Sequence, residues 1–133
     1  MRAIVATPGS TAPRVITTDI PTAGPGEVLI RVHASVVNPV DAWVLTDSGR
    51  DAFRLSGQFG IGWDLAGTVA APAEGFAEGT PVAATFTALG SPTAAHAEYA
   101  VVPRSAVAII PEGVTMAAAA TVALNALTAR QAL

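Results

Sequence analysis

Hydrophobic and polar residues alternate along short segments of this chain, and turn residues separate the segments. In the clearest case, residues 27–37, Val28, Ile30 and Val32 share one face and charged residues lie on the other. A period of two over this length predicts a half-buried strand. Similar segments bounded by Gly, Pro or Ser lie at 2–6, 14–18, 64–71, 81–86, 96–102 and 106–110. Many short strands with frequent turns favour a mainly β fold, a barrel or sandwich, over a parallel sheet.

Two stretches have helical patterns. Residues 38–45 predict a short helix, because Asn38 can cap it and Pro39 suits its first position. From residue 114 to 133 the chain is rich in alanine and lacks Gly and Pro, and Thr115 suits the N-cap position. We therefore predict one continuous terminal helix. Because the sequence stops within this pattern, we expect a first domain at 1–113 and a connecting helix at 114–133 that leads to a further domain.

Composition narrows the class of protein. The 133 residues are 51% hydrophobic and 13% charged, which is typical of a compact globular domain. The net charge of −3 and the absence of a basic stripe argue against nucleic acid or an anionic membrane as partner. The first residues lack a long apolar segment, and no apolar tract is long enough to span a bilayer. We therefore expect a cytoplasmic protein.

Five motifs occur in the order typical of the medium-chain dehydrogenase/reductase superfamily. The strand at 25–32 and the loop at 34–41 resemble the entry to that superfamily's active-site helix. Residues 62–69 resemble its G-x-[DE]-x-[AS]-G-x-V strand, and 97–103 resemble its A-E-[YF] strand. Leu127-Thr128-Ala129 is similar to part of the helix that crosses to the cofactor domain. Among the superfamily's groups, the zinc-independent quinone oxidoreductases are the ones that the chain resembles.

This resemblance implies a GroES-like β-barrel with a short active-site helix and a terminal helix leading to a Rossmann domain. It further implies an NADPH-dependent quinone or enone oxidoreductase, a small-molecule substrate and a homodimer in the full-length form. The sequence contains no G-x-G-x-x-G turn between a strand and a helix, so we expect NADPH to bind mainly outside these residues and this chain alone to be inactive. The alternative is a stand-alone GroES-like module for binding or assembly without catalysis.

Zinc is not expected. The superfamily's zinc alcohol dehydrogenases have a cysteine where Asn38 falls and a His-Glu pair where Trp63-Asp64 falls, and this chain has no cysteine at all. A catalytic zinc usually takes three protein ligands from sulfur, imidazole and carboxylate. His33 and His96 lie on different predicted strands with no ligand spacing, and we interpret both as ordinary strand histidines.

Asn38 and Asp41 are the candidate catalytic residues. In the group that the chain resembles, an N-x-x-D loop lies beside the nicotinamide and the substrate. An asparagine amide both donates and accepts hydrogen bonds, so it can fix a carbonyl or amide group in place. The alternative needs no ligand, because Asn38 can cap the short helix and Asp41 can interact with the helix dipole.

The remaining candidates line a cleft or contact the cofactor. With Asn38, the resemblance assigns cofactor contacts to Trp43 and Thr128, and a substrate pocket to Trp43, Phe59 and Trp63. Each has a structural alternative: packing for the aromatic residues, and a hydrogen bond to the helix's own carbonyls for Thr128. Asp64 aligns with an acidic position of the superfamily motif, where we favour a structural role.

Overall fold

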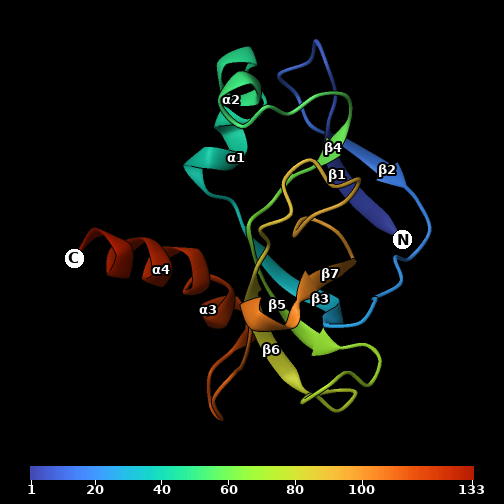
Figure 1. The fold of residues 1–133 in the computed structure, drawn as a ribbon, viewed down its shortest axis with the longest axis vertical. Helices are drawn as coiled ribbons and strands as arrows, with labels where there is room; N and C mark the ends of the chain where they lie inside the picture. Colours follow the sequence, from blue (N-terminus) through green and yellow to red (C-terminus); the bar gives the residue numbers. More distant parts are fainter.

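A curled antiparallel sheet forms the body of the domain in the computed structural model, which describes all of residues 1–133 (Figure 1). Its five strands have the order β7-β3-β5-β6-β8, and a second sheet has the order β2-β1-β4. The strands are β1 (Arg2–Ala6), β2 (Arg14–Thr17), β3 (Glu27–Val36), β4 (Phe59–Gly60), β5 (Asp64–Val69), β6 (Pro81–Thr85), β7 (Tyr99–Pro103) and β8 (Val107–Ile109). The predicted mainly β, GroES-like fold is confirmed.

The alternating pattern determines which side chains are buried. Val28 and Ile30 of β3 are fully buried, and they join a core cluster with β5, β6 and β7, whose other members include Leu65, Val82 and Val102. The first half of β3 pairs with β7 and the second half with β5. This shared pairing carries β3 across the sheet to its end at Val36, where the helical segment begins.

One predicted strand begins later than expected. The pattern predicts a strand from His96, whereas β7 begins at Tyr99. Ala97 instead forms an isolated bridge with Ala3 of β1. Residues 96–98 therefore contact the smaller sheet before the chain joins the larger one. This path places His96 beside Asp41, in the segment that follows β3.

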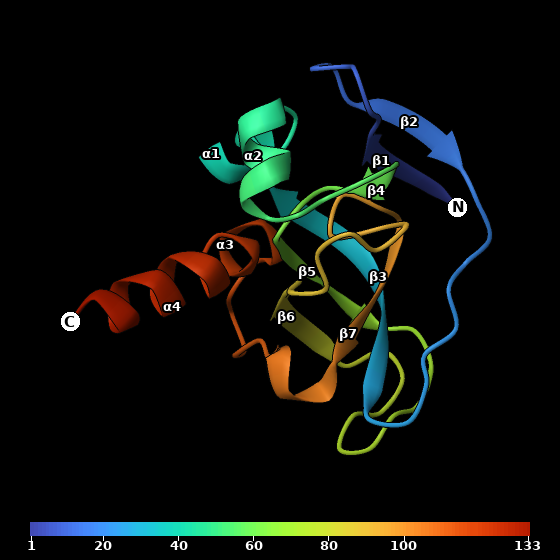
Figure 2. The ribbon, with the colours of Figure 1, turned by 45° about the horizontal axis from the view of Figure 1, so that its top comes forward.

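Two short helices follow β3. The predicted helix at 38–45 is α1 (Pro39–Trp43), with Asn38 at its N-cap position. A second helix, α2 (Asp47–Ala52), follows in a segment whose conformation the residue pattern does not predict. Its N-cap is Thr46, whose hydroxyl accepts a hydrogen bond from the Gly49 amide. Both helices lie at one end of the sheets (Figure 2).

The prediction of one continuous terminal helix is wrong. After the short 3-10 turn η1 (Arg104–Ala106) and β8, the chain forms α3 (Met116–Ala120) and then α4 (Ala123–Ala132). The predicted N-cap is confirmed, because the Thr115 hydroxyl accepts a hydrogen bond from the Ala118 amide. Thr121 ends α3 by donating its hydroxyl to the Ala118 carbonyl. Ala119 and Ala120 pack against the barrel, whereas α4 projects away from it (Figures 1 and 2). None of the helices combines the length and apolar character needed to cross a membrane.

Candidate functional site

A buried polar cluster lies where β3 ends and β5 begins. It consists of Asn38, Asp41, Asp64 and His96, whose exposed fractions are 8%, 3%, 0% and 9%. Asn38 follows the end of β3, Asp41 lies in the first turn of α1, and Asp64 is the first residue of β5. Buried charged groups need hydrogen-bond partners, so the bonds of these residues define the geometry of the site.

Asp41 fixes the backbone on both sides of the cluster. Its Oδ2 accepts a hydrogen bond from the Asn38 backbone amide at 2.7 Å, and its Oδ1 accepts one from the Gly62 amide at 3.0 Å. The first bond lies within the turn that begins α1, and the second joins α1 to the segment before β5. Asp41 therefore ties the Asn38 loop to the strand that carries Asp64.

Asp64 joins the same loop to the terminal helix. Its Oδ2 accepts a hydrogen bond from Nδ2 of Asn38 at 3.0 Å, and its Oδ1 accepts one from the Leu124 backbone amide at 2.8 Å. Leu124 lies in the first turn of α4, where backbone amides lack partners within the helix. A residue of β5 thus supplies an acceptor for the start of α4, just after the break between α3 and α4. The structural role favoured for Asp64 is confirmed in this respect.

The two histidines differ in their surroundings. His33 is exposed, and its Nε2 lies 3.2 Å from the Thr68 hydroxyl on β5, as expected for an ordinary strand histidine. His96 is buried, and its Nδ1 lies 2.9 Å from the Ser35 hydroxyl. Its Nε2 faces Oδ2 of Asp41 at 3.7 Å. No sequence pattern predicts this contact, because Ser35 and His96 are 61 positions apart.

Gly62 allows the chain to pass between Asp41 and His96. Its φ is +103°, and a Cβ at this position would lie 2.6 Å from the His96 backbone nitrogen and 2.8 Å from its Nδ1. Both the backbone conformation and the close approach therefore require glycine.

Replacing Gly62 by alanine is expected to lower the free energy of unfolding by about 2 kcal/mol, because it adds a clash to the cost of a positive φ. Gly113, with a φ of +82° and open space around it, is the matched control. Alanine at Gly113 is expected to cost about 1 kcal/mol from the backbone alone. Urea denaturation measures the free energy of unfolding of both variants. Equal decreases would show that the close approach of Gly62 to His96 adds no cost.

Three aromatic side chains form a row beside α1. The ring of Trp43 lies 5.5 Å from that of Phe53, and the ring of Phe53 lies 5.8 Å from that of Trp63. Trp43 is 44% exposed and Trp63 is half-buried. The structure therefore brings together two of the three aromatic residues predicted for the substrate pocket. Phe53 is the residue that links them.

Phe59 and Thr128 are not members of this row. Phe59 is buried in a core cluster against which Phe53 packs, and it lines a small cavity together with Trp63. The Arg50 guanidinium lies 4.9 Å from the centre of the Phe59 ring. Thr128 is exposed on α4, one helical turn after Leu124. Residues four apart lie on the same face of a helix. Thr128 is therefore on the face of α4 whose first turn is held by Asp64.

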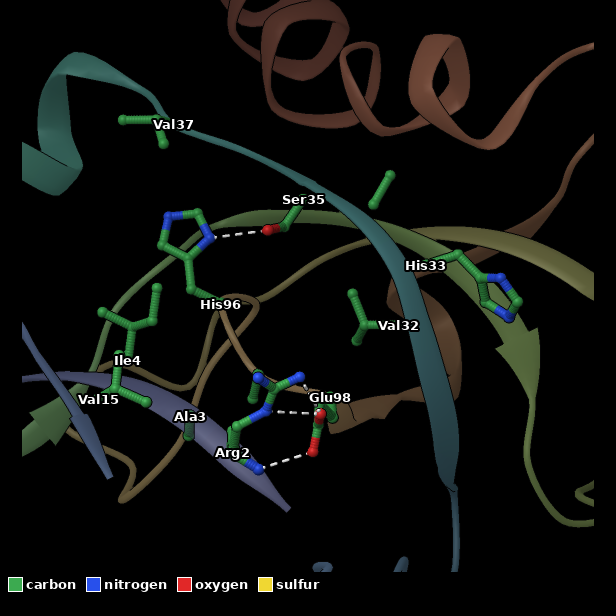
Figure 3. Close-up of a pocket in the computed structure, with 12 residues that line it drawn as sticks. Arg2, Ala3, Ile4, Val15, Val32, His33, Ser35, Val37, His96 and Glu98 are labelled. Carbon is green, nitrogen blue, oxygen red and sulfur yellow. Dashed lines mark hydrogen bonds and ion pairs between the residues drawn. The ribbon is translucent and has the colours of Figure 1, made fainter. Parts of the chain in front are cut away.

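An open groove of about 450 Å³ lies between β1 and β3 (Figure 3). Ser35 and His96 lie at its upper wall, and Arg2 and Glu98 form an ion pair of 2.8 Å at its base. Arg2 lowers the pKa of the Glu98 carboxyl group. The hydrogen bond from its backbone amide has the largest effect, and the hydrogen bonds from its side chain come next. The predicted site residues do not line this groove. His96 is therefore the one residue of the buried cluster that lines the groove, beside its partner Ser35.

Residues 1–133 contain no group of three or more His, Cys, Asp or Glu side chains arranged to hold a metal ion. The two carboxylates of the cluster each accept two N–H donors from the chain itself. Their geometry is that of hydrogen-bonded anchors for the loop and for α4.

With this fold and cluster in place, comparison with known families identifies the class of protein. Residues 24–112 match the alcohol dehydrogenase GroES-like domain, and the chain belongs to this family. The predicted membership of the medium-chain dehydrogenase/reductase superfamily is thereby confirmed, and its known members include oxidoreductases. A search of curated proteins returns no significant match.

Solved structures of similar fold include oxidoreductases. A mycobacterial protein complexed with NADPH is 30% identical, with a TM-score of 0.82, over 100% of this chain and 39% of its own. A mycobacterial quinone oxidoreductase is 30% identical, with a TM-score of 0.77, over 100% of this chain and 40% of its own. An alcohol dehydrogenase superfamily protein from Novosphingobium aromaticivorans is 29% identical, with a TM-score of 0.84, over 98% and 40%. The chain thus spans about two fifths of each of these structures.

Proposed function

We propose that residues 1–133 form the substrate-binding domain of a zinc-independent, NADPH-dependent oxidoreductase that reduces quinones or enones. The observation that supports this most directly is the buried cluster, in which Asp64 holds both Asn38 and the start of α4. Family membership and the similarity to an NADPH complex and to a quinone oxidoreductase support the same proposal. The substrate in this proposal is a small molecule, and the intact gene product is a cytoplasmic homodimer.

The exposed residues around the cluster fit contact with a planar cofactor and substrate. Trp43 is 44% exposed, and an exposed indole can stack on a nicotinamide or quinone ring. The exposed hydroxyl of Thr128 can donate or accept a hydrogen bond. Asn38 and Asp41 hold the loop beneath these contacts. NADPH, when bound, supplies the hydride for the electrophilic carbon, and a proton from water completes the reduction.

The donor set of the cluster supports a reaction without zinc. The position at which zinc members of the superfamily carry a thiolate is Asn38, and its Nδ2 donates to Asp64. An amide nitrogen has no free lone pair for a metal, because that pair is delocalised into the carbonyl group, so Asn38 offers no equivalent of the thiolate. Without a Lewis acid, polarisation of the carbonyl falls to hydrogen-bond donors near the Asn38 loop.

Steady-state kinetics of the intact gene product test this proposal. We expect NADPH oxidation in the presence of 1,4-benzoquinone or an enone, and no loss of rate after treatment with a zinc chelator. Asn38→Ala should lower kcat/KM by about a hundredfold, because the loop that carries the reaction geometry is no longer held. Asn125→Ala is the matched control, because Asn125 is exposed and its side chain donates a hydrogen bond to the nearby Thr121 carbonyl.

Two outcomes would contradict the proposal. Loss of turnover on chelation would assign the chemistry to a metal. Binding of NADPH or of an apolar ligand without any turnover would favour the alternative of a GroES-like binding module.

A further inference from the structure

His96 lies between a groove and the candidate site. Its ring is buried, its Nδ1 is 2.9 Å from the Ser35 hydroxyl, and its Nε2 is 3.7 Å from Oδ2 of Asp41. Nε2 has no hydrogen-bond partner at shorter range, although the atom is buried. Buried polar atoms of native proteins nearly always have a hydrogen-bond partner. A buried nitrogen without one, facing a carboxylate, therefore needs an explanation.

The neighbours of the ring determine where its proton lies. A serine hydroxyl can donate or accept, so Ser35 satisfies Nδ1 in either state. The Asp41 carboxylate can only accept when ionised. A lone pair on Nε2 would face its negative charge, whereas an N–H on Nε2 is attracted to it. Both the tautomer protonated at Nε2 and the doubly protonated ring satisfy this condition, and the tautomer protonated at Nδ1 does not.

We propose that His96 is a positioning residue for the candidate site, acting through Asp41, with its Nε2–H directed at the carboxylate. The proposal rests on the proposed function, because it assigns His96 a part in holding the Asn38 loop for that reaction. Asp41 is the carboxylate that binds the backbone amides of Asn38 and Gly62. A restraint on Asp41 is therefore a restraint on both segments.

Gly62 keeps the imidazole in place. Gly62 has no side chain, and this leaves room for the ring. A Cβ at this position would lie 2.7 Å from Cγ of His96. The ring is thus confined between the Gly62 backbone, Ser35 and Asp41. A side chain confined in this way restrains its neighbours, because it cannot turn away from them.

Other charged groups near His96 are already paired. Arg2 and Glu98, which line the same groove, form an ion pair with each other. His33 also lines this groove, and its Nε2 lies 3.2 Å from the Thr68 hydroxyl. Asp64 is linked to Asp41 only through Asn38. Asp41 is therefore the charged group that Nε2 of His96 faces.

Nuclear magnetic resonance of the intact gene product tests the contact. The ring nitrogen shifts of His96 should show a proton on Nε2 and none on Nδ1 in the neutral form.

A pair of variants separates positioning from simple packing. Glutamine can place an amide donor near the position of Nε2, whereas asparagine, which is shorter, places its amide near Nδ1. We expect His96→Gln to keep kcat for NADPH oxidation close to the original value. His96→Asn should lower kcat by about tenfold with little change in KM for NADPH, since the loop is misplaced rather than the cofactor lost.

The proposal is overturned if the neutral ring carries its proton on Nδ1. Equal activity of the glutamine and asparagine variants would also overturn it. Absence of NADPH oxidation in the unsubstituted protein would instead reject the proposed function. The ring nitrogen shifts would still decide whether His96 directs an N–H at Asp41.

Discussion

Replacing Asp41 by alanine is expected to lower the free energy of unfolding by about 4 kcal/mol. The carboxylate accepts hydrogen bonds from the buried amides of Asn38 and Gly62 at 2.7 and 3.0 Å. Alanine leaves both amides without an acceptor, and each buried, unsatisfied donor costs about 1–3 kcal/mol. The start of α1 and the segment before β5 lose their connection at the same time. The loss should appear as a lower midpoint of urea denaturation at an unchanged slope.

Two further variants define this effect. Asp41→Asn retains one oxygen as acceptor, so its loss should be about half as large. Asp19→Ala removes a carboxylate that is exposed, and the change should stay within about 0.5 kcal/mol. If Asp41→Ala is no more destabilising than Asp19→Ala, the carboxylate does not anchor the loop.

Replacing Asp64 by alanine is expected to cost about 3 kcal/mol and to loosen α4. The fully buried carboxylate binds Nδ2 of Asn38 at 3.0 Å and the Leu124 amide at 2.8 Å. The Asn38 amide is buried and the Leu124 amide is partly buried, so the cost is smaller than at Asp41. Because the start of α4 loses its acceptor, the amides of residues 123–126 should exchange faster with solvent.

Hydrogen exchange distinguishes this effect from general destabilisation. In Asp64→Ala, protection in β3 and β6 should fall only as far as the global stability falls, whereas protection at the start of α4 should fall further. Thr115→Ala serves as a control, since it removes the cap of α3 and leaves the Asp64 contacts intact. Unchanged exchange at Leu124 in Asp64→Ala would contradict the assigned bond.

Local pattern was sufficient to predict most of the fold. Apart from the two-residue strand β4, the strands follow from period two, and the N-cap positions of Asn38 and Thr115 follow from their residue types. Helix α2 is not predicted, and it contains Gly49, a poor helix former. The structure explains this residue: a Cβ at Gly49 would lie 2.1 Å from the carbonyl oxygen of Trp43, so the two short helices can pack only with glycine there.

The site depends more on contacts between distant residues. The sequence and the superfamily resemblance indicated Asn38 and Asp41, and the structure brings Asp64 and His96 to them. The bond at the start of α4 joins Leu124 to Asp64 across 60 positions. The contact of His96 with Ser35 spans 61. No periodicity or spacing rule applies at such separations, so these roles emerge only from the packed structure.

Transfer of deuterium from NADPH tests the central claim most directly. The intact gene product is incubated with an enone and NADPH that carries deuterium on the transferable position of C4, and the product is analysed by mass spectrometry. We expect one deuterium on the former electrophilic carbon. The label should be retained when a zinc chelator is present, and Asn38→Ala should slow its transfer. A product without deuterium, or no product while the enone still binds, would contradict the assignment of this domain to an NADPH-dependent reductase.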